Sequence, residues 1–203
     1  MCAHLQTLEG KAKPDSELPP TKANKKAGSN APSNFDLRGE LYRISGTDLT
    51  QIDGINVMNA QTIIAEIGVD MSRFSTEGNF ASFLGLSPDN RITGGKVLRR
   101  GTKRVENRAA TALRMAATSL WRSKTYLGAK FRRLRARLGA PKAITAMAHM
   151  LARLVCRMLG HGEQYVDKGI KYFEEKYRQH EILSIQEKAK DLSFAVTLTP
   201  AAE

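Results

Sequence analysis

Aromatic residues and cysteines are both scarce in this chain, and each shortage narrows the fold class. Aromatic residues make up 6% of its 203 residues, which argues against an aromatic-rich β-sandwich and against an extensive base-stacking surface. Cys2 and Cys156 lie far apart and have no Cys or His at metal-ligand spacing, so no disulfide framework and no metal site are indicated. We therefore expect a mainly α-helical domain with a core of Leu, Ile, Ala and Met, in a reducing cytoplasm.

Long apolar runs are missing as well. The N-terminal residues contain no apolar signal core, and no run approaches the roughly 18 apolar residues that are needed to span a bilayer. We expect a soluble protein without a membrane partner.

Acidic residues are almost absent from one long segment, residues 90–162. This segment holds eighteen Lys and Arg against a single acid, Glu106, so it alone carries a charge of about +17. The whole chain carries +12, so the rest of the chain is net acidic. Such a surface attracts a polyanion. The apolar faces here consist largely of Ala, Leu and Met, which predicts an interior rather than a membrane-lying helix. Nucleic acid is the expected partner.

Composition divides the chain into three parts. Residues 1–34 are predicted to be a disordered or linker arm, because the stretch 11–34 is rich in Pro, Lys, Ser and Asn and has few large apolar groups to offset the entropy of ordering. Residues 35–195 are predicted to form the helical domain, and residues 196–203 a tail. Because a linker so near the N-terminus joins the domain to very little, we expect that something upstream is missing.

Helical periodicity recurs through the domain. It predicts helices near residues 35–46, 57–68, 79–84, 103–123, 126–138, 141–159 and 167–192. The last of these is charged on much of its surface and is a candidate to pack on another chain. Residues 92–98 are predicted to be either two short extended pieces around Gly94 and Gly95 or one loop.

The turn at residues 52–56 is the first candidate for nucleic-acid contact. A glycine turn that enters a helix exposes backbone N–H groups, which can hold a phosphate without reading sequence. Gly54 lies in such a turn, so residues 49–68 resemble a helix-hairpin-helix motif, although Asn56 stands where a second glycine is usual. The alternative is an ordinary turn between two helices.

Basic residues supply the other candidates. A flexible segment rich in Gly and Thr, with long cations, can follow a phosphate strand, and the alternative is a solvated loop. Its members are Arg91, Lys96, Arg99, Arg100, Lys103 and Arg104. Arg132 and Arg133 on the helix 126–138 are predicted to contact nucleic acid too. Lys142, His149, Arg153 and Arg157 fall roughly along one face of the next helix, which is either solvated or in contact with a backbone.

Thr93 is the candidate nucleophile. Its hydroxyl precedes Gly94 and Gly95 among several cations, so glycines would allow close approach of a phosphodiester and the cations would stabilise a pentacoordinate phosphate. Without further information, Thr93-Gly94-Gly95 is simply a turn.

Three stretches carry a resemblance to a known family. They read DLTQIDGINVMNAQTIIAEIGVDMSRF, then FASFLGLSPDNRITGGKVLRRGTKRVENRAATALRMAATSL, then YLGAKFRRLRARLGAPKAITAMAHMLARLV. Residues 35–195 thereby resemble the C-terminal transposase domain of the insertion-sequence family numbered one hundred and ten (the one-one-six, one-one-zero and nine-zero-two type), within it the eleven-eleven subgroup.

The resemblance implies a DNA transposase or recombinase. Full-length members join an N-terminal nuclease-like domain, with four acidic residues that bind Mg²⁺, to a helical domain with a serine that attacks DNA. A structured guide RNA aligns target and donor DNA, and the assembly is a dimer or tetramer. The acidic half is absent from this sequence, so no cofactor is expected in this chain itself.

The family's serine turn falls on Thr93, Gly94 and Gly95, so a threonine replaces the attacking serine. Threonine is bulkier and stiffer at χ1 than serine. Two functions follow as expectations: a bacterial, nucleoid-associated segment that exchanges DNA strands once the acidic half is supplied, as a homo-oligomer or with a full-length transposase, or a non-catalytic nucleic-acid-binding or oligomerisation remnant.

Overall fold

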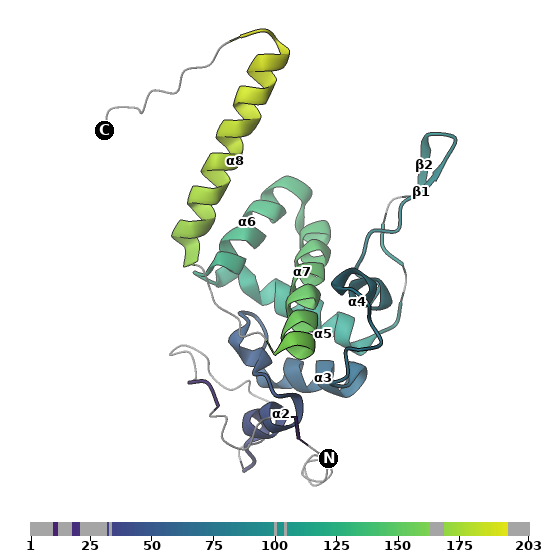
Figure 1. Ribbon diagram of the computed structural model, residues 1–203, viewed down its shortest axis with the longest axis vertical. Coiled ribbons are helices and arrows are strands. Elements are labelled where there is room, and N and C mark those ends of the chain that lie inside the picture. The colour runs from purple at the N-terminus through teal and green to yellow at the C-terminus, as the bar shows by residue number, and fades with distance from the viewer. Residues whose placement is uncertain are drawn as a thin grey trace.

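The structure is a computed structural model that describes residues 10–11, 18–20, 32, 34–99, 101–103, 105–162 and 169–194. Over these residues the chain is mainly helical, as the sequence predicts, and it carries one two-stranded antiparallel hairpin. Figure 1 shows a helical body from which the hairpin and a long C-terminal helix project.

The central element of the body is α7 (Ala140–His161), which packs against α4 (Glu77–Phe83), α5 (Arg108–Ser119) and α6 (Tyr126–Leu138). Pro141 lies in its first turn, where the missing N–H costs nothing. Among the residues that the structure describes, α7 is long and apolar enough to cross a membrane. Half of its most apolar window is buried by the other helices, as in the core helix of a globular domain.

An alanine stripe on α5 lets α3 (Val57–Ile67) and α7 approach it closely. The residues along this side of the helix are all buried, namely Ala109, Ala112, Leu113, Ala116, Ala117 and Leu120. The helix starts five residues later than the predicted position 103, because the Asn107 side chain caps it by accepting from the Ala110 N–H at 3.1 Å. It ends in a 3₁₀ turn, η2 (Leu120–Arg122).

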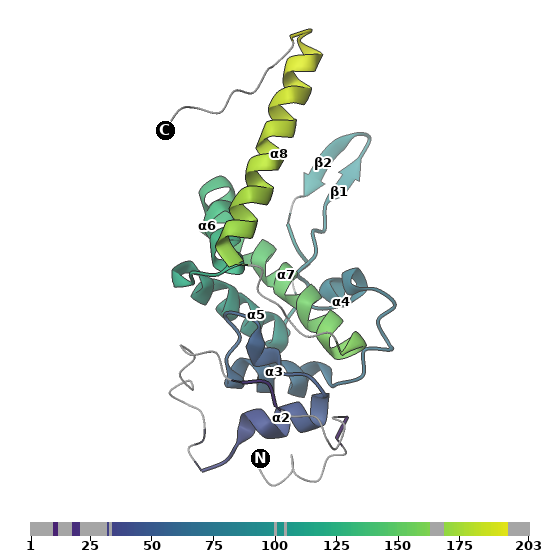
Figure 2. The same ribbon diagram turned by 60° about the vertical axis from the view of Figure 1, so that its left-hand side comes forward.

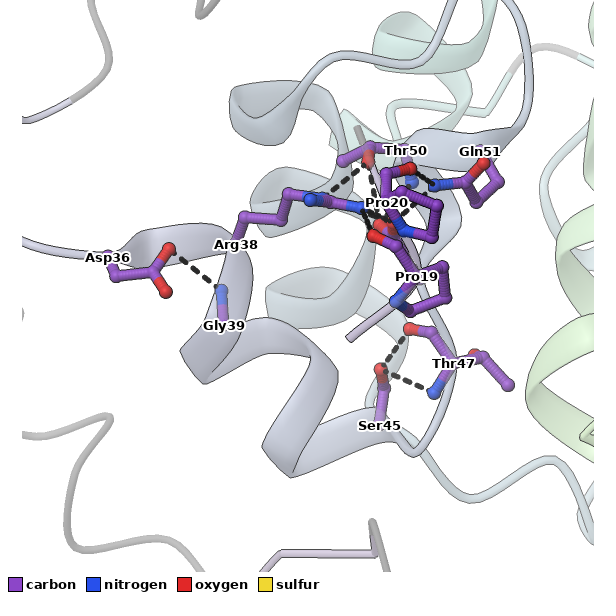
Figure 3. Close-up of polar contacts among 10 residues, drawn as sticks. Pro19, Pro20, Asp36, Arg38, Gly39, Ser45, Thr47, Thr50 and Gln51 are labelled. Carbon is purple, nitrogen blue, oxygen red and sulfur yellow. Dashed lines mark hydrogen bonds and ion pairs between the residues drawn. The ribbon is translucent and has the colours of Figure 1, made fainter. Parts of the chain in front are cut away.

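A polar network joins the N-terminal elements, α2 (Leu37–Ser45) and the 3₁₀ turn η1 (Leu49–Gln51). Asp48 accepts from Arg38 at 2.5 Å and from the Thr50 hydroxyl at 2.6 Å, and its side chain is 3% exposed. Arg38 also donates to the Pro19 carbonyl, which ties that segment to the body (Figure 3). Burial would raise the pKa of Asp48, but hydrogen bonds from Arg38, Thr50 and Gln51 outweigh it and lower that pKa.

The C-terminal helix α8 (Gly169–Asp191) packs on α6 and then extends away from the body, as Figures 1 and 2 both show. Its bounds match the predicted helix 167–192 closely, and α6 matches the predicted 126–138. The predicted arm lies outside the described residues except for 10–11, 18–20, 32 and 34, and the predicted tail lies outside them entirely. Lys11, within that arm, donates from Nζ to the Val69 carbonyl at 2.9 Å.

Candidate nucleic-acid interface

The candidate nucleophile lies on a projecting hairpin formed by β1 (Arg91–Thr93) and β2 (Lys96–Arg99). The strands pair antiparallel, with Thr93 opposite Lys96. A stalk continues the hairpin toward the body, where Pro88 bridges Thr102 and the Asp89 N–H donates to the Gly101 carbonyl at 2.6 Å. In both views of the ribbon the hairpin stands clear of the helices (Figures 1 and 2). The extended alternative for residues 92–98 is therefore confirmed, and the loop alternative is wrong.

Gly94 and Gly95 form the tip of the hairpin. Both have positive φ, 56° and 75°, which is the backbone of a two-residue type I′ turn and is strained for residues with a side chain. A Cβ built on either glycine would meet nothing within 4 Å. Glycine is needed at these two positions because of the positive φ, and it adds no side chain to the tip.

Thr93 and Lys96 flank that tip and are both exposed. Within the described part of the chain, the Thr93 hydroxyl makes no side-chain hydrogen bond. A phosphate could reach this hydroxyl without displacing another group.

The other cations of the predicted basic run fall on the two arms of the same hairpin. Arg91 pairs in register with Arg99, with an irregularity in the ladder between residues 91 and 92, and Lys103 is exposed on the returning stalk. Arg100 and Arg104 lie outside the described residues. The hairpin thus gathers Arg91, Thr93, Lys96 and Arg99 into one ribbon, which the sequence placed only in one segment.

The turn at Gly54 lies elsewhere, between η1 and α3. Gly54 has φ +87°, and an added Cβ would come within 2.5 Å of the Ala116 carbonyl oxygen on α5. The Asn56 side chain caps α3 by accepting from the Asn59 N–H at 2.7 Å. Both residues therefore have structural roles. A single 3₁₀ turn precedes them, so a helix-hairpin-helix and its contact with nucleic acid remain predictions.

Arg132 and Arg133 on α6 also have partners within the chain. Arg132 donates to the Ser123 carbonyl at 2.7 Å, which holds the loop after η2. The Arg133 guanidinium lies 3.7 Å from the ring centroid of Tyr177 on α8, a cation–π contact that joins these helices. In both figures α6 and the hairpin lie on opposite sides of α7. Contact of these two arginines with nucleic acid also remains a prediction.

The basic face of α7 is an ion-pair surface. Arg153 and Arg157 both bind Glu77 in the first turn of α4, at 2.8 and 2.7 Å. Burial would raise the pKa of Glu77, but the hydrogen bonds and charges of the two arginines outweigh it and lower that pKa. Burial lowers the pKa of His149, and the nearby Arg153 charge lowers it further. This face therefore joins α7 to α4.

Sequence reasoning missed one contact, between Trp121 and Arg135. The Arg135 guanidinium lies 4.1 Å from the ring centroid of Trp121, which is 44% exposed. The signal in the sequence that could have predicted it is a lone tryptophan beside Arg122 and Lys124 in the basic segment 90–162.

The resemblance implies metal ligands in an N-terminal nuclease-like domain of full-length family members. Among the residues that the structure describes, no group of three or more His, Cys, Asp and Glu side chains is placed to hold a metal ion.

Comparison with known proteins gives one match. Residues 46–133, which include the turn at Gly54, the whole hairpin and most of α6, match the model of the transposase family IS116/IS110/IS902. No curated protein and no solved structure matches the chain. This segment, which contains the projecting hairpin with Thr93, is similar to the IS116/IS110/IS902 transposase family.

Proposed function

We propose that this chain is the DNA-contacting part of a transposase, and that Thr93 is its strand-attacking group when a partner supplies the acidic nuclease-like half. The observation that carries the proposal is the hairpin tip. There, an exposed hydroxyl stands directly opposite an exposed lysine and next to two glycines without side chains.

The shape of the hairpin suits a duplex. A two-stranded ribbon fits the major groove of DNA, which is about 12 Å wide, and the arms of this ribbon carry Arg91, Lys96 and Arg99. Lysine and arginine side chains neutralise phosphates and release counterions, which gives binding energy without sequence preference. The bare Gly94-Gly95 tip would let the backbone approach a phosphate closely.

The proposed step is a transesterification. The Thr93 oxygen attacks phosphorus and forms a phosphothreonine ester, one DNA oxygen leaves with the bonding electron pair, and the hydroxyl proton passes to a base. Lys96 would stabilise the extra negative charge on the phosphate oxygens. The base is expected from the partner half, which the complete reaction requires.

A covalent-adduct assay tests the nucleophile. In a complex reconstituted with the acidic half of a family member, Thr93→Ala should abolish the protein–DNA adduct and Thr93→Ser should retain it. Thr102→Ala, on the stalk, is the matched control and should behave as wild type. Equal adduct from Thr93→Ala would remove Thr93 from the role.

DNA binding by the isolated chain is tested separately, by fluorescence anisotropy of a labelled duplex over a range of salt. We expect the affinity for DNA to fall steeply with salt, because the basic segment 90–162 would bind the phosphates of the duplex. An affinity that is unchanged between low and high salt would contradict the proposal. Binding that persists without any adduct, even with Thr93→Ser, would instead support a non-catalytic nucleic-acid-binding remnant.

Guide RNA and other transposase chains are further partners in this proposal. A structured RNA presents the same phosphate charge as DNA, so it should compete with duplex DNA in the anisotropy assay. Sedimentation with and without a full-length family member would measure self-association and association in trans. A monomer that binds neither RNA nor a full-length partner would limit the proposal to DNA.

A further inference from the structure

Trp121 is the largest side chain exposed on a cationic part of the body. It lies in η2, between α5 and α6, and it is the only tryptophan in the chain. Its neighbour Leu120 is fully buried and anchors the turn in the core. An exposed indole at a fixed position is unusual, because burying such a ring is strongly favourable.

The backbone beneath Trp121 is held by hydrogen bonds. Arg132 donates to the Ser123 carbonyl at 2.7 Å and to the Trp121 carbonyl at 3.4 Å, and the Ser123 N–H donates to the Leu120 carbonyl at 3.0 Å. Thr125 begins α6 and lies 2.8 Å from the Ser123 hydroxyl. The ring therefore projects from a preorganised turn, which reduces the entropy lost on binding a ligand.

Charge around the indole is of one sign. Arg135 covers part of the ring from α6, at 4.1 Å from the centroid, and Arg122 and Lys124 are exposed beside Trp121 in sequence. The sequence contains no acid between Glu106 and Glu163. A ligand for this surface should combine negative charge with a flat π surface. Nucleotides combine both, and unpaired bases stack on aromatic rings and on arginine planes.

We propose that the Trp121–Arg135 stack binds an unpaired base of a nucleic acid, while the surrounding cations hold its phosphates. This rests on the proposed function, because it assumes that the chain engages nucleic acid. It adds a second contact, on α6 and η2, which lies across α7 from the hairpin. The hairpin would contact a duplex, and this stack would take a base from a single-stranded segment.

Intrinsic tryptophan fluorescence gives a direct test on the unmodified chain, because Trp121 is the only tryptophan. Three oligonucleotides of equal length are titrated: a single strand, its abasic counterpart with the same phosphate charge, and a duplex. We expect strong quenching by the single strand and much weaker quenching by the other two. Equal quenching by the abasic strand would show a charge effect without stacking and would overturn the proposal.

Variants separate stacking from charge. Trp121→Leu should weaken binding of the single strand about fivefold or more, since base–aromatic stacking contributes about 1–3 kcal/mol, and Trp121→Phe should restore much of that loss. Neither should change the affinity for a duplex. Arg135→Gln should weaken single-strand binding more than the matched control Arg137→Gln, which removes an equal charge from the same helix.

The outcomes distinguish this inference from the proposed function. Salt-sensitive binding without selective quenching by the single strand would overturn the stack and leave the proposed function standing. A chain that binds no nucleic acid by anisotropy would overturn both. An acidic peptide that quenches Trp121 as well as the single strand does would assign the surface to a protein partner instead.

Discussion

The cations of the helical body and those of the hairpin belong to the same basic segment, residues 90–162, but they differ in what they contact. In the body, Arg132 holds a loop carbonyl and Arg153 and Arg157 bind Glu77. On the hairpin, Lys96 is exposed beside Gly94 and Gly95 and has none of these partners. Charge density in a sequence therefore locates a basic region, but it does not show which cations remain available to a ligand. Substitutions in the body should change stability, and those on the hairpin should change binding.

The largest expected effect is on the buried pair of the body. Asp48→Ala removes the carboxylate that accepts from Arg38 and Thr50, and breaking a buried ion pair costs about 3–5 kcal/mol because the remaining charge is left without compensation. Urea unfolding should show a loss of this size. Asp70→Ala, at an exposed carboxylate, is the control, and an equal loss there would contradict the interpretation.

Two glycines compare the regions directly. Gly54→Ala should lower the free energy of unfolding by about 3 kcal/mol, because the new Cβ crowds the Ala116 carbonyl at positive φ. Gly94 also has positive φ, but the Cβ that Gly94→Ala adds would meet nothing within 4 Å. A hairpin of two strands is marginally stable and can open locally, so the free energy of unfolding of the body should change by less than about 1 kcal/mol. Similar losses for the two variants would break the comparison.

Glu77 should give a smaller effect that depends on pH. Glu77→Gln should cost about 1 kcal/mol at neutral pH, since its two arginine partners are half-exposed. The folded-state pKa of Glu77 is lowered, so its contribution is present above the unfolded carboxyl pKa and is lost as pH falls through the folded value. Melting temperatures of wild type and variant should therefore converge in acid. A constant difference at every pH would assign the effect to packing.

The smallest effect on stability is expected at the hairpin. Lys96→Ala should leave unfolding unchanged, because the side chain is exposed. It should weaken duplex binding and reduce the slope of log affinity against log salt by about one unit, as expected for the loss of one phosphate contact. A change in melting temperature with an unchanged salt slope would reverse the roles of the two regions.

Much of the fold followed from sequence because local rules agreed with packing. The helix near residues 57–68 and the span of α6 were both predicted from periodicity. The start of α5 was not, because charged residues before Asn107 have acceptable helix propensity and only the Asn107 cap and the returning stalk fix the boundary. The sequence located the candidate site within one segment. It did not predict which of its residues are exposed or how the two strands pair.

Sequence by itself determined the helical class, the basic segment and the Thr93-Gly94-Gly95 turn. These depend on residue type and spacing along the chain, and the family match covers the turn and part of the basic segment. Tertiary structure decided which residues are free to act. It placed Gly54 against Ala116, paired Arg153 and Arg157 with Glu77, and set Arg135 over Trp121. Such pairings join residues distant in sequence, so they form only when the helices pack, and local propensity does not encode them.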